Sequence, residues 1–106
     1  MPYVPPSPAP TPGAIYWVQV PFWDKAESKG RPALIHRVGS GGIAVYPIYS
    51  NQRPGRLAVP AGPLTGLSHL SWLDPTLVLV RPGHVGRRMS ATLRLAVSRG
   101  SLRRVA

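Results

Sequence analysis

Short apolar runs, separated by polar breaks, recur along the chain in a pattern typical of β-strands. Strands are expected where β-branched and aromatic residues gather between breaks rich in glycine and proline. These segments are residues 14–20, 33–38, 43–49, 57–59, 67–73 and 76–80. The glycines of residues 39–42, between the second and third segments, supply the positive-φ positions of a hairpin turn. The pattern therefore predicts a mainly β protein.

In the last quarter of the chain, the spacing of apolar residues changes from that of a strand to that of a helix. Ser90 suits the N-cap of a helix, and Leu93, Ala96 and Val97 then recur at helical spacing until Gly100. We therefore expect a C-terminal helix after the strands. Short strands, tight turns and one helix together predict a small SH3-like barrel. Its modest core favours pairing with a second copy of the chain.

Residues 1–13 differ from the rest in composition. They contain six of the fourteen prolines and no charged side chain. Proline fixes φ and removes a backbone donor, which favours a flexible tail. The alternative is a docking ligand, because Pro5 and Pro8 form a P-x-x-P motif. We therefore predict a proline-rich tail over residues 1–13 and a single domain over residues 14–106.

The charge of the chain is strongly unbalanced. Its 106 residues include 13 Lys and Arg but 3 Asp and Glu, which gives a formal net charge of +10. Seven arginines and no acidic residue lie in residues 81–106. This balance favours a polyanionic partner such as nucleic acid. Without a signal peptide pattern or an apolar run long enough to cross a membrane, we expect a cytoplasmic protein.

Several kinds of catalytic site are excluded by composition. The absence of cysteine rules out disulfides, zinc–thiolate sites and thiol nucleophiles. Six other candidates are scattered along the chain: Asp24, Glu27, Asp74, His36, His69 and His84. They suggest no metal cluster, carboxylate pair or cofactor motif, so we expect neither metal nor cofactor. Metal-free RNA cleavage fits these limits, because the nucleophile is the 2′-hydroxyl of the RNA itself.

Four short motifs follow one another in a characteristic order. They are G-x-I-x-W at residues 13–17, K-G-R-P at 29–32, P-I-x-S at 47–50 and G-L-S-H-L-S-W at 66–72. In this order the chain resembles the PemK/MazF-like toxin family. Members of that family are small homodimeric barrels that cleave single-stranded RNA and are the toxin halves of bacterial toxin–antitoxin pairs. The resemblance implies the same fold, activity, homodimer and antitoxin partner here.

The resemblance also implies roles for residues near two strand ends. Arg31 corresponds to the family's arginine, which stabilises the pentacovalent phosphate and assists proton transfer. Tyr49 stands where the family has a threonine that hydrogen-bonds the scissile phosphate, and Ser50 follows it. Either Ser50 takes over, or Tyr49 uses its own hydroxyl, or cleavage is weakened or lost. Because a strand alternates its faces, Tyr49 and Ser50 can share a site only where the strand has ended.

Further RNA contacts are expected from the flanking segments. In the loop of residues 22–30, Trp23 would stack on a base and Lys29 would bind phosphate. Arg53 and Arg56, which follow the third strand, would line an RNA groove. The alternatives are packing for Trp23 and solubilising charge for the two arginines. Trp17 lies within a strand and is expected in the core.

Three classes of function remain open. The first is a metal-independent endoribonuclease toxin that cleaves single-stranded RNA, inhibits growth and is neutralised by an antitoxin protein. The second is a catalytically impaired relative that binds RNA or a host protein, which the tyrosine at position 49 favours. The third is a small basic barrel that binds DNA or the ribosome, whose affinity would fall steeply with salt.

Overall fold

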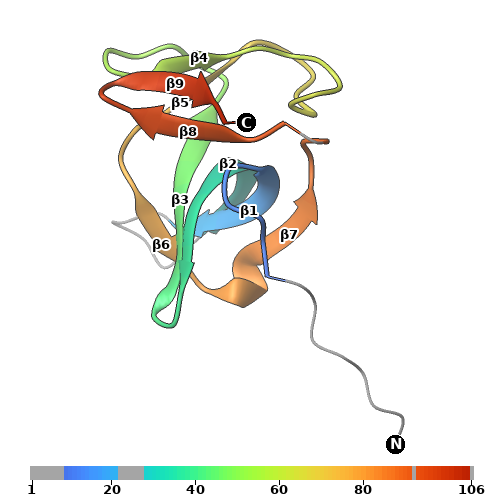
Figure 1. The fold of residues 1–106 in the computed structure, drawn as a ribbon, viewed down its shortest axis with the longest axis vertical. Coiled ribbons are helices and arrows are strands. Elements are labelled where there is room, and N and C mark those ends of the chain that lie inside the picture. The colour runs from blue at the N-terminus through green and yellow to red at the C-terminus, as the bar shows by residue number, and fades with distance from the viewer. Residues whose placement is uncertain (1–8, 22–27, 92, 106) are drawn as a thin grey trace, which may run out of the picture.

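Nine β-strands and one 3₁₀ turn make up most of the protein in a computed structural model that describes residues 9–21, 28–91 and 93–105 (Figure 1). Their bounds are β1 (Ile15–Pro21), β2 (Ser28–Gly39), β3 (Gly42–Tyr49), β4 (Leu57–Val59), β5 (Ser71–Leu73), β6 (Val78–Val80), η1 (Pro82–His84), β7 (Val85–Arg88), β8 (Leu95–Ser98) and β9 (Ser101–Arg104). Trp23 and most of the proline-rich tail lie outside the described residues. The prediction of a mainly β protein is confirmed.

Seven of the strands belong to one antiparallel sheet. Its pairing order is β4-β5-β3-β2-β1-β7, and β6 pairs with β3 beside this path. The predicted hairpin joins β2 to β3, and Gly39 lies opposite Gly42. The φ of Gly42 is 136°, a backbone conformation that glycine adopts far more readily than other residues. Within the described residues the path ends at β4 and β7, so the strand ladder does not close into the predicted barrel.

The core lies on both faces of the three long strands. Because side chains alternate along a strand, neighbouring residues of β2 enter different clusters. Leu34 packs in a cluster with residues of β3, β4 and β5, whereas Ala33 and Ile35 pack in a second cluster with residues of β1, β3 and β6. The two clusters thus bury side chains on both faces of the central strands.

The prediction of a C-terminal helix is wrong. Residues 95–104 form the two-stranded hairpin β8–β9, which lies beside β4 (Figure 1). Arg99 and Gly100 have φ values of 49° and 73°, and two successive positive φ angles make the tight turn that joins antiparallel strands. The glycine that suggested a helix end is therefore a turn residue. Ser90 caps no helix either: it is buried and accepts a hydrogen bond of 2.9 Å from the backbone N–H of Ile15.

Residues ahead of β1 are already attached to the fold. The backbone N–H of Thr11 donates to the hydroxyl of Tyr16 at 3.2 Å. The N–H of Gly13 donates to the carbonyl of Ile35 at 2.8 Å. The chain thus enters β1 from a fixed direction.

Across the described part of the chain, the structure contains no helix with the length and apolar character that a membrane crossing requires.

Candidate functional site

A cavity of about 440 Å³ brings together most of the residues that the sequence singled out. It opens between the start of β2, the end of β3, the segment that leads into β5, and β7. Lys29, Arg31, Tyr49 and Ser50 all line it. We refer to this hollow as the Arg31 cavity. Because β3 ends at Tyr49, Ser50 is free of the strand's alternation, and both residues reach the same cavity.

Arg31 is held in place by strand pairing. The sequence pattern predicts a loop over residues 22–30, but β2 already begins at Ser28. Arg31 lies opposite Val18 of β1, and the next pair along is Trp17 with Pro32. The Arg31 side chain is half-buried at the wall of the cavity. A guanidinium on a paired strand has a better defined position than one on a free loop.

Tyr49 lies against two arginines. The guanidinium carbon of Arg31 is 4.3 Å from the centre of its ring, and that of Arg56 is 3.9 Å away. Both distances are those of cation–π contacts, which contribute about 0.5–1 kcal/mol at exposed sites and more when desolvated. The tyrosine ring therefore orients the side chain of Arg31.

Arg56 is fixed from its other side. Its Nη1 donates to the carbonyl of Asn51 at 3.0 Å, and its Nε lies 3.8 Å from Oδ2 of Asp74. The Arg56 side chain is 12% exposed. It supports the ring of Tyr49 and is not among the residues that line the Arg31 cavity. Arg53 is exposed and also lies outside the lining, so the structure does not bring these two predicted RNA contacts into the cavity.

The prediction that Trp17 lies in the core is wrong. Its side chain is 38% exposed and lines the Arg31 cavity, while Val18 and Val20 of the same strand fill the core. The indole lies over the backbone of Gly30: a Cβ atom there would be 2.7 Å from Nε1 of Trp17. Glycine at position 30 thus makes room for the tryptophan at the cavity wall.

The lining residues that sequence reasoning missed include Ser68, His69 and Arg87. The motif at residues 66–72 contains His69, but the three histidines are scattered along the sequence and suggest no shared site. Arg87 reaches the cavity because β7 pairs with β1. That pairing joins residues about seventy positions apart, and no local pattern reveals it. The only sequence signal for His69 was its place inside the motif.

Hydrogen bonds hold the segment that carries His69. The buried hydroxyl of Thr65 donates to the carbonyl of Pro60 at 2.7 Å and accepts from the N–H of Leu67 at 3.3 Å. The hydroxyl of Ser71 donates to the carbonyl of His69 at 3.0 Å. These bonds fix the backbone on both sides of position 69.

The same segment packs closely against the end of β7, and His69 is paired within it. Gly66 has a φ of 78°, and a Cβ atom at this position would overlap the carbonyl group of Met89, so the segment passes close to the end of β7. Oγ of Ser68 lies 3.1 Å from Nδ1 of His69. The histidine is exposed to the cavity, with one ring nitrogen already paired.

The Arg31 cavity is positively charged. Lys29, Arg31 and Arg87 line it, and no acidic residue that the structure describes does so. Asp74, the one acidic residue in the described ranges, lies beside Arg56 instead. Cationic groups around hydroxyl and aromatic groups form a site for an anionic ligand.

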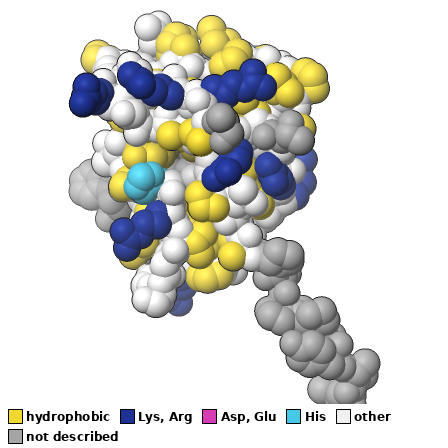
Figure 2. All heavy atoms as spheres, in the orientation of Figure 1, with side chains coloured by type: hydrophobic (Ala, Val, Ile, Leu, Met, Phe, Trp, Pro, Cys, Tyr) yellow, Lys and Arg dark blue, Asp and Glu magenta, His cyan; other side chains and the backbone are white. Residues whose placement is uncertain are grey.

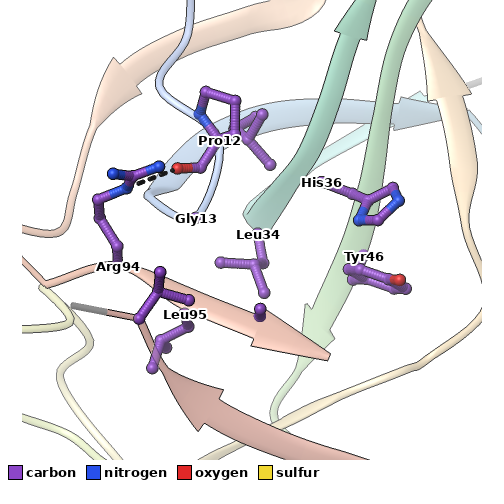
Figure 3. A pocket seen from close by; sticks show the side chains of 10 residues that line it. Pro12, Gly13, Leu34, His36, Tyr46, Arg94 and Leu95 are labelled. Atoms are coloured by element: carbon purple, nitrogen blue, oxygen red, sulfur yellow. Dashed lines mark hydrogen bonds between the residues drawn. The ribbon is translucent and has the colours of Figure 1, made fainter. Parts of the chain in front are cut away.

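A second hollow, of about 220 Å³, differs in character (Figure 3). Its walls are largely apolar, and the Nε of Arg94 donates to the carbonyl of Pro12 at 3.2 Å. His36 packs edge-on against Tyr46, with ring centres 5.4 Å apart. Figure 2 shows the face seen in Figure 1, with Lys and Arg side chains spread over it and no acidic side chain among the described atoms. Of the residues that the structure describes, Arg94 is the one Lys or Arg that lines the second hollow, which therefore does not gather cations as the Arg31 cavity does.

In the described ranges, no group of three or more His, Cys, Asp or Glu residues could hold a metal ion. The chain matches no protein-family model and no curated protein sequence. The resemblance to PemK/MazF-like toxins therefore stays a prediction, and the residues of the Arg31 cavity are the basis for a proposed function.

Proposed function

We propose that the protein is a metal-independent endoribonuclease that cleaves single-stranded RNA in the Arg31 cavity. The observation that carries this proposal is that Lys29, Arg31 and Arg87 line the same cavity as Tyr49 and Ser50. Three cations suit the phosphates of a nucleic-acid backbone. A half-buried guanidinium beside hydroxyl groups suits one phosphate that changes its charge during a reaction.

The chemistry needs no metal and consumes no water. The 2′-oxygen of the RNA attacks the adjacent phosphorus, and the bond from phosphorus to the 5′-oxygen breaks. The products are a 2′,3′-cyclic phosphate and a 5′-hydroxyl. The phosphorane that forms between these steps carries additional negative charge, which the guanidinium of Arg31 would stabilise through two N–H donors.

Tyr49 and Ser50 would divide the work of the family's threonine. The ring of Tyr49 contacts Arg31 and thereby positions its guanidinium. The exposed hydroxyl of Ser50 donates to Oδ1 of Asn51 at 3.0 Å. Rotation about one side-chain bond would direct that donor to a phosphate oxygen instead. The tyrosine is in this way compatible with cleavage.

Preference for single strands would come from Trp17. Its exposed indole lies at the cavity wall, where it can stack on an unpaired base. Lys29 and Arg87 would bind the phosphates on either side of the cleaved one. Arg53, exposed after β3, would contact the chain beyond the cavity.

The wider biological role follows from the same resemblance. We propose that the protein is related to PemK/MazF-like toxins, forms a homodimer in the cytoplasm, and inhibits growth until an antitoxin protein binds it. The support is the order of the four motifs, the mainly β fold, and the presence of Arg31, Tyr49 and Ser50 in one cavity.

The direct test is to incubate purified protein with RNA in excess chelator. We expect cleavage of single-stranded RNA, no cleavage of the same sequence in a duplex, and products that end in a 2′,3′-cyclic phosphate. Intact RNA, or cleavage only after Mg²⁺ is added, would contradict the proposal. RNA that is bound but left intact would support the second candidate, a non-catalytic relative, which the tyrosine at position 49 favours.

A further inference from the structure

We propose that His69 is the general base of this reaction and takes the proton from the attacking 2′-hydroxyl. The proposal rests on the RNA cleavage proposed above. It starts from position: His69 lines the same cavity as Arg31, although it comes from a different part of the chain. It is exposed there, so an RNA strand in the cavity can reach its ring.

The chemistry of the lining residues singles out this histidine. A general base must be unprotonated near neutral pH and must have a lone pair that accepts a proton readily. Lys29, Arg31 and Arg87 carry positive charge, and the hydroxyl groups of Tyr49 and Ser50 are weak proton acceptors. The indole of Trp17, which also lines the cavity, can only donate a hydrogen bond. Among the described residues of the lining, the imidazole of His69 alone offers a lone pair of this kind.

The surroundings of His69 keep one ring nitrogen available. Oγ of Ser68 lies 3.1 Å from Nδ1. When Nδ1 carries the proton and donates it to Ser68, Nε2 keeps its lone pair and can accept from the RNA. The hydrogen bond from Ser71 to the carbonyl of His69 holds the backbone at the same time. A base whose side chain is already held in one orientation loses less conformational entropy when the substrate binds.

The proton balance of the step is simple. Nε2 takes the proton as the bond from the 2′-oxygen to phosphorus forms and the bond from phosphorus to the 5′-oxygen breaks. The 5′-oxygen takes a proton from solvent, and the imidazolium returns its proton to solvent after the products leave.

The charged or titratable groups that share the cavity with His69 are Lys29 and Arg31 of β2, Tyr49 of β3 and Arg87 of β7.

The test compares His69→Gln with His84→Gln. His84 is exposed in η1 and does not line the cavity, so it is a matched control. We expect His69→Gln to lower kcat by about 100-fold or more, with little change in RNA affinity, because loss of a general base typically costs about 10²–10⁴-fold. The wild-type rate should rise with pH, because a general base acts without its proton, and this rise should vanish in His69→Gln. His84→Gln should keep both the rate and the pH profile.

A second variant separates catalysis from structure. We expect added imidazole to restore part of the activity of His69→Ala, because the side chain is exposed and its removal leaves the cavity open. If wild-type protein cleaves RNA in chelator but His69→Gln keeps the wild-type rate and pH profile, His69 is not the base and the nuclease proposal stands. If the wild-type protein leaves RNA intact in chelator, both proposals fail.

Discussion

The Arg31 cavity and the C-terminal hairpin both contain arginine, but they hold these side chains in different ways. Arg31, which lines the cavity, and Arg56, which lies outside the lining, both contact the ring of Tyr49, and neither is fully exposed. In the hairpin, Arg99 and Arg103 are exposed. A guanidinium fixed by its neighbours can stabilise charge at one defined point, whereas exposed cations act mainly through long-range attraction that salt screens. The net charge of +10 therefore divides into a few positioned cations and a larger number that attract a polyanion.

Replacing one arginine from each region should give the largest contrast. Arg31→Ala removes the group that would stabilise the phosphorane, so we expect cleavage to fall by about 10²–10³-fold. Arg103→Ala removes an exposed charge of β9 and should change the rate by no more than about 3-fold at moderate salt. Initial cleavage rates in chelator measure both. Equal losses in the two variants would show that the cavity has no special role.

Trp17 tests whether the cavity also binds a base. Trp17→Ala should weaken the affinity for single-stranded RNA by about tenfold, because base stacking on an aromatic side chain is worth about 1–3 kcal/mol. Trp17→Phe keeps an aromatic face and should lose much less. Fluorescence anisotropy with a labelled oligonucleotide that lacks the 2′-hydroxyl at the cleaved position gives these affinities without cleavage. Unchanged binding by Trp17→Ala would place the bases elsewhere.

Tyr49 tests how Arg31 is positioned. Tyr49→Phe keeps the ring that contacts Arg31 and Arg56, so its cleavage rate should stay within about 3-fold of the wild type. Tyr49→Ala removes the ring and should lower the rate by about tenfold, as expected for cation–π contacts of about 0.5–2 kcal/mol. Equal losses in the two variants would show that the phenol hydroxyl itself takes part in the reaction.

The hairpin turn offers the smallest expected effect, and it concerns stability rather than cleavage. Gly100 has a φ of 73°, so Gly100→Ala forces an alanine into the left-handed region at a cost of about 1 kcal/mol. The control is Gly83→Ala, because Gly83 lies outside the positive-φ region and a Cβ atom there would meet no neighbour within 4 Å. Thermal unfolding should show a melting temperature lowered by a few degrees for Gly100→Ala alone. RNA cleavage should be unchanged in both.

Local patterns predicted much of the sheet. Short runs rich in β-branched and aromatic residues, with the glycines at positions 39–42 between them, located the β2–β3 hairpin correctly. The end of the strand at Tyr49 also made it possible for Ser50 to join the same cavity. These features depend on neighbours in the sequence, where side-chain alternation and turn chemistry decide the structure.

The C-terminal hairpin could not be predicted in this way. Leu93, Ala96 and Val97 fit a helical period, but Leu95, Val97 and Leu102 share one face of a hairpin and pack on the core. The tight turn at Arg99 and Gly100 decides in favour of strands.

The cavity itself depends on contacts between distant segments. Trp17, His69 and Arg87 come together through the pairing of β1 with β7 and through the hydrogen-bonded segment before β5. Such contacts leave no periodic trace in one sequence. The sequence could therefore name Arg31, Tyr49 and Ser50, but not the groups that complete the site.

The most direct test of the central claim is to map where RNA binds. Amide chemical shifts of labelled protein should be recorded with a short single-stranded oligonucleotide that lacks the 2′-hydroxyl at the cleaved position, since it binds without being cut. We predict that the largest changes fall on the Arg31 cavity, at residues 29–31, 49–50, 66–71 and 87. Changes centred on the hairpin at residues 95–104, with the cavity unaffected, would contradict a binding site in the cavity.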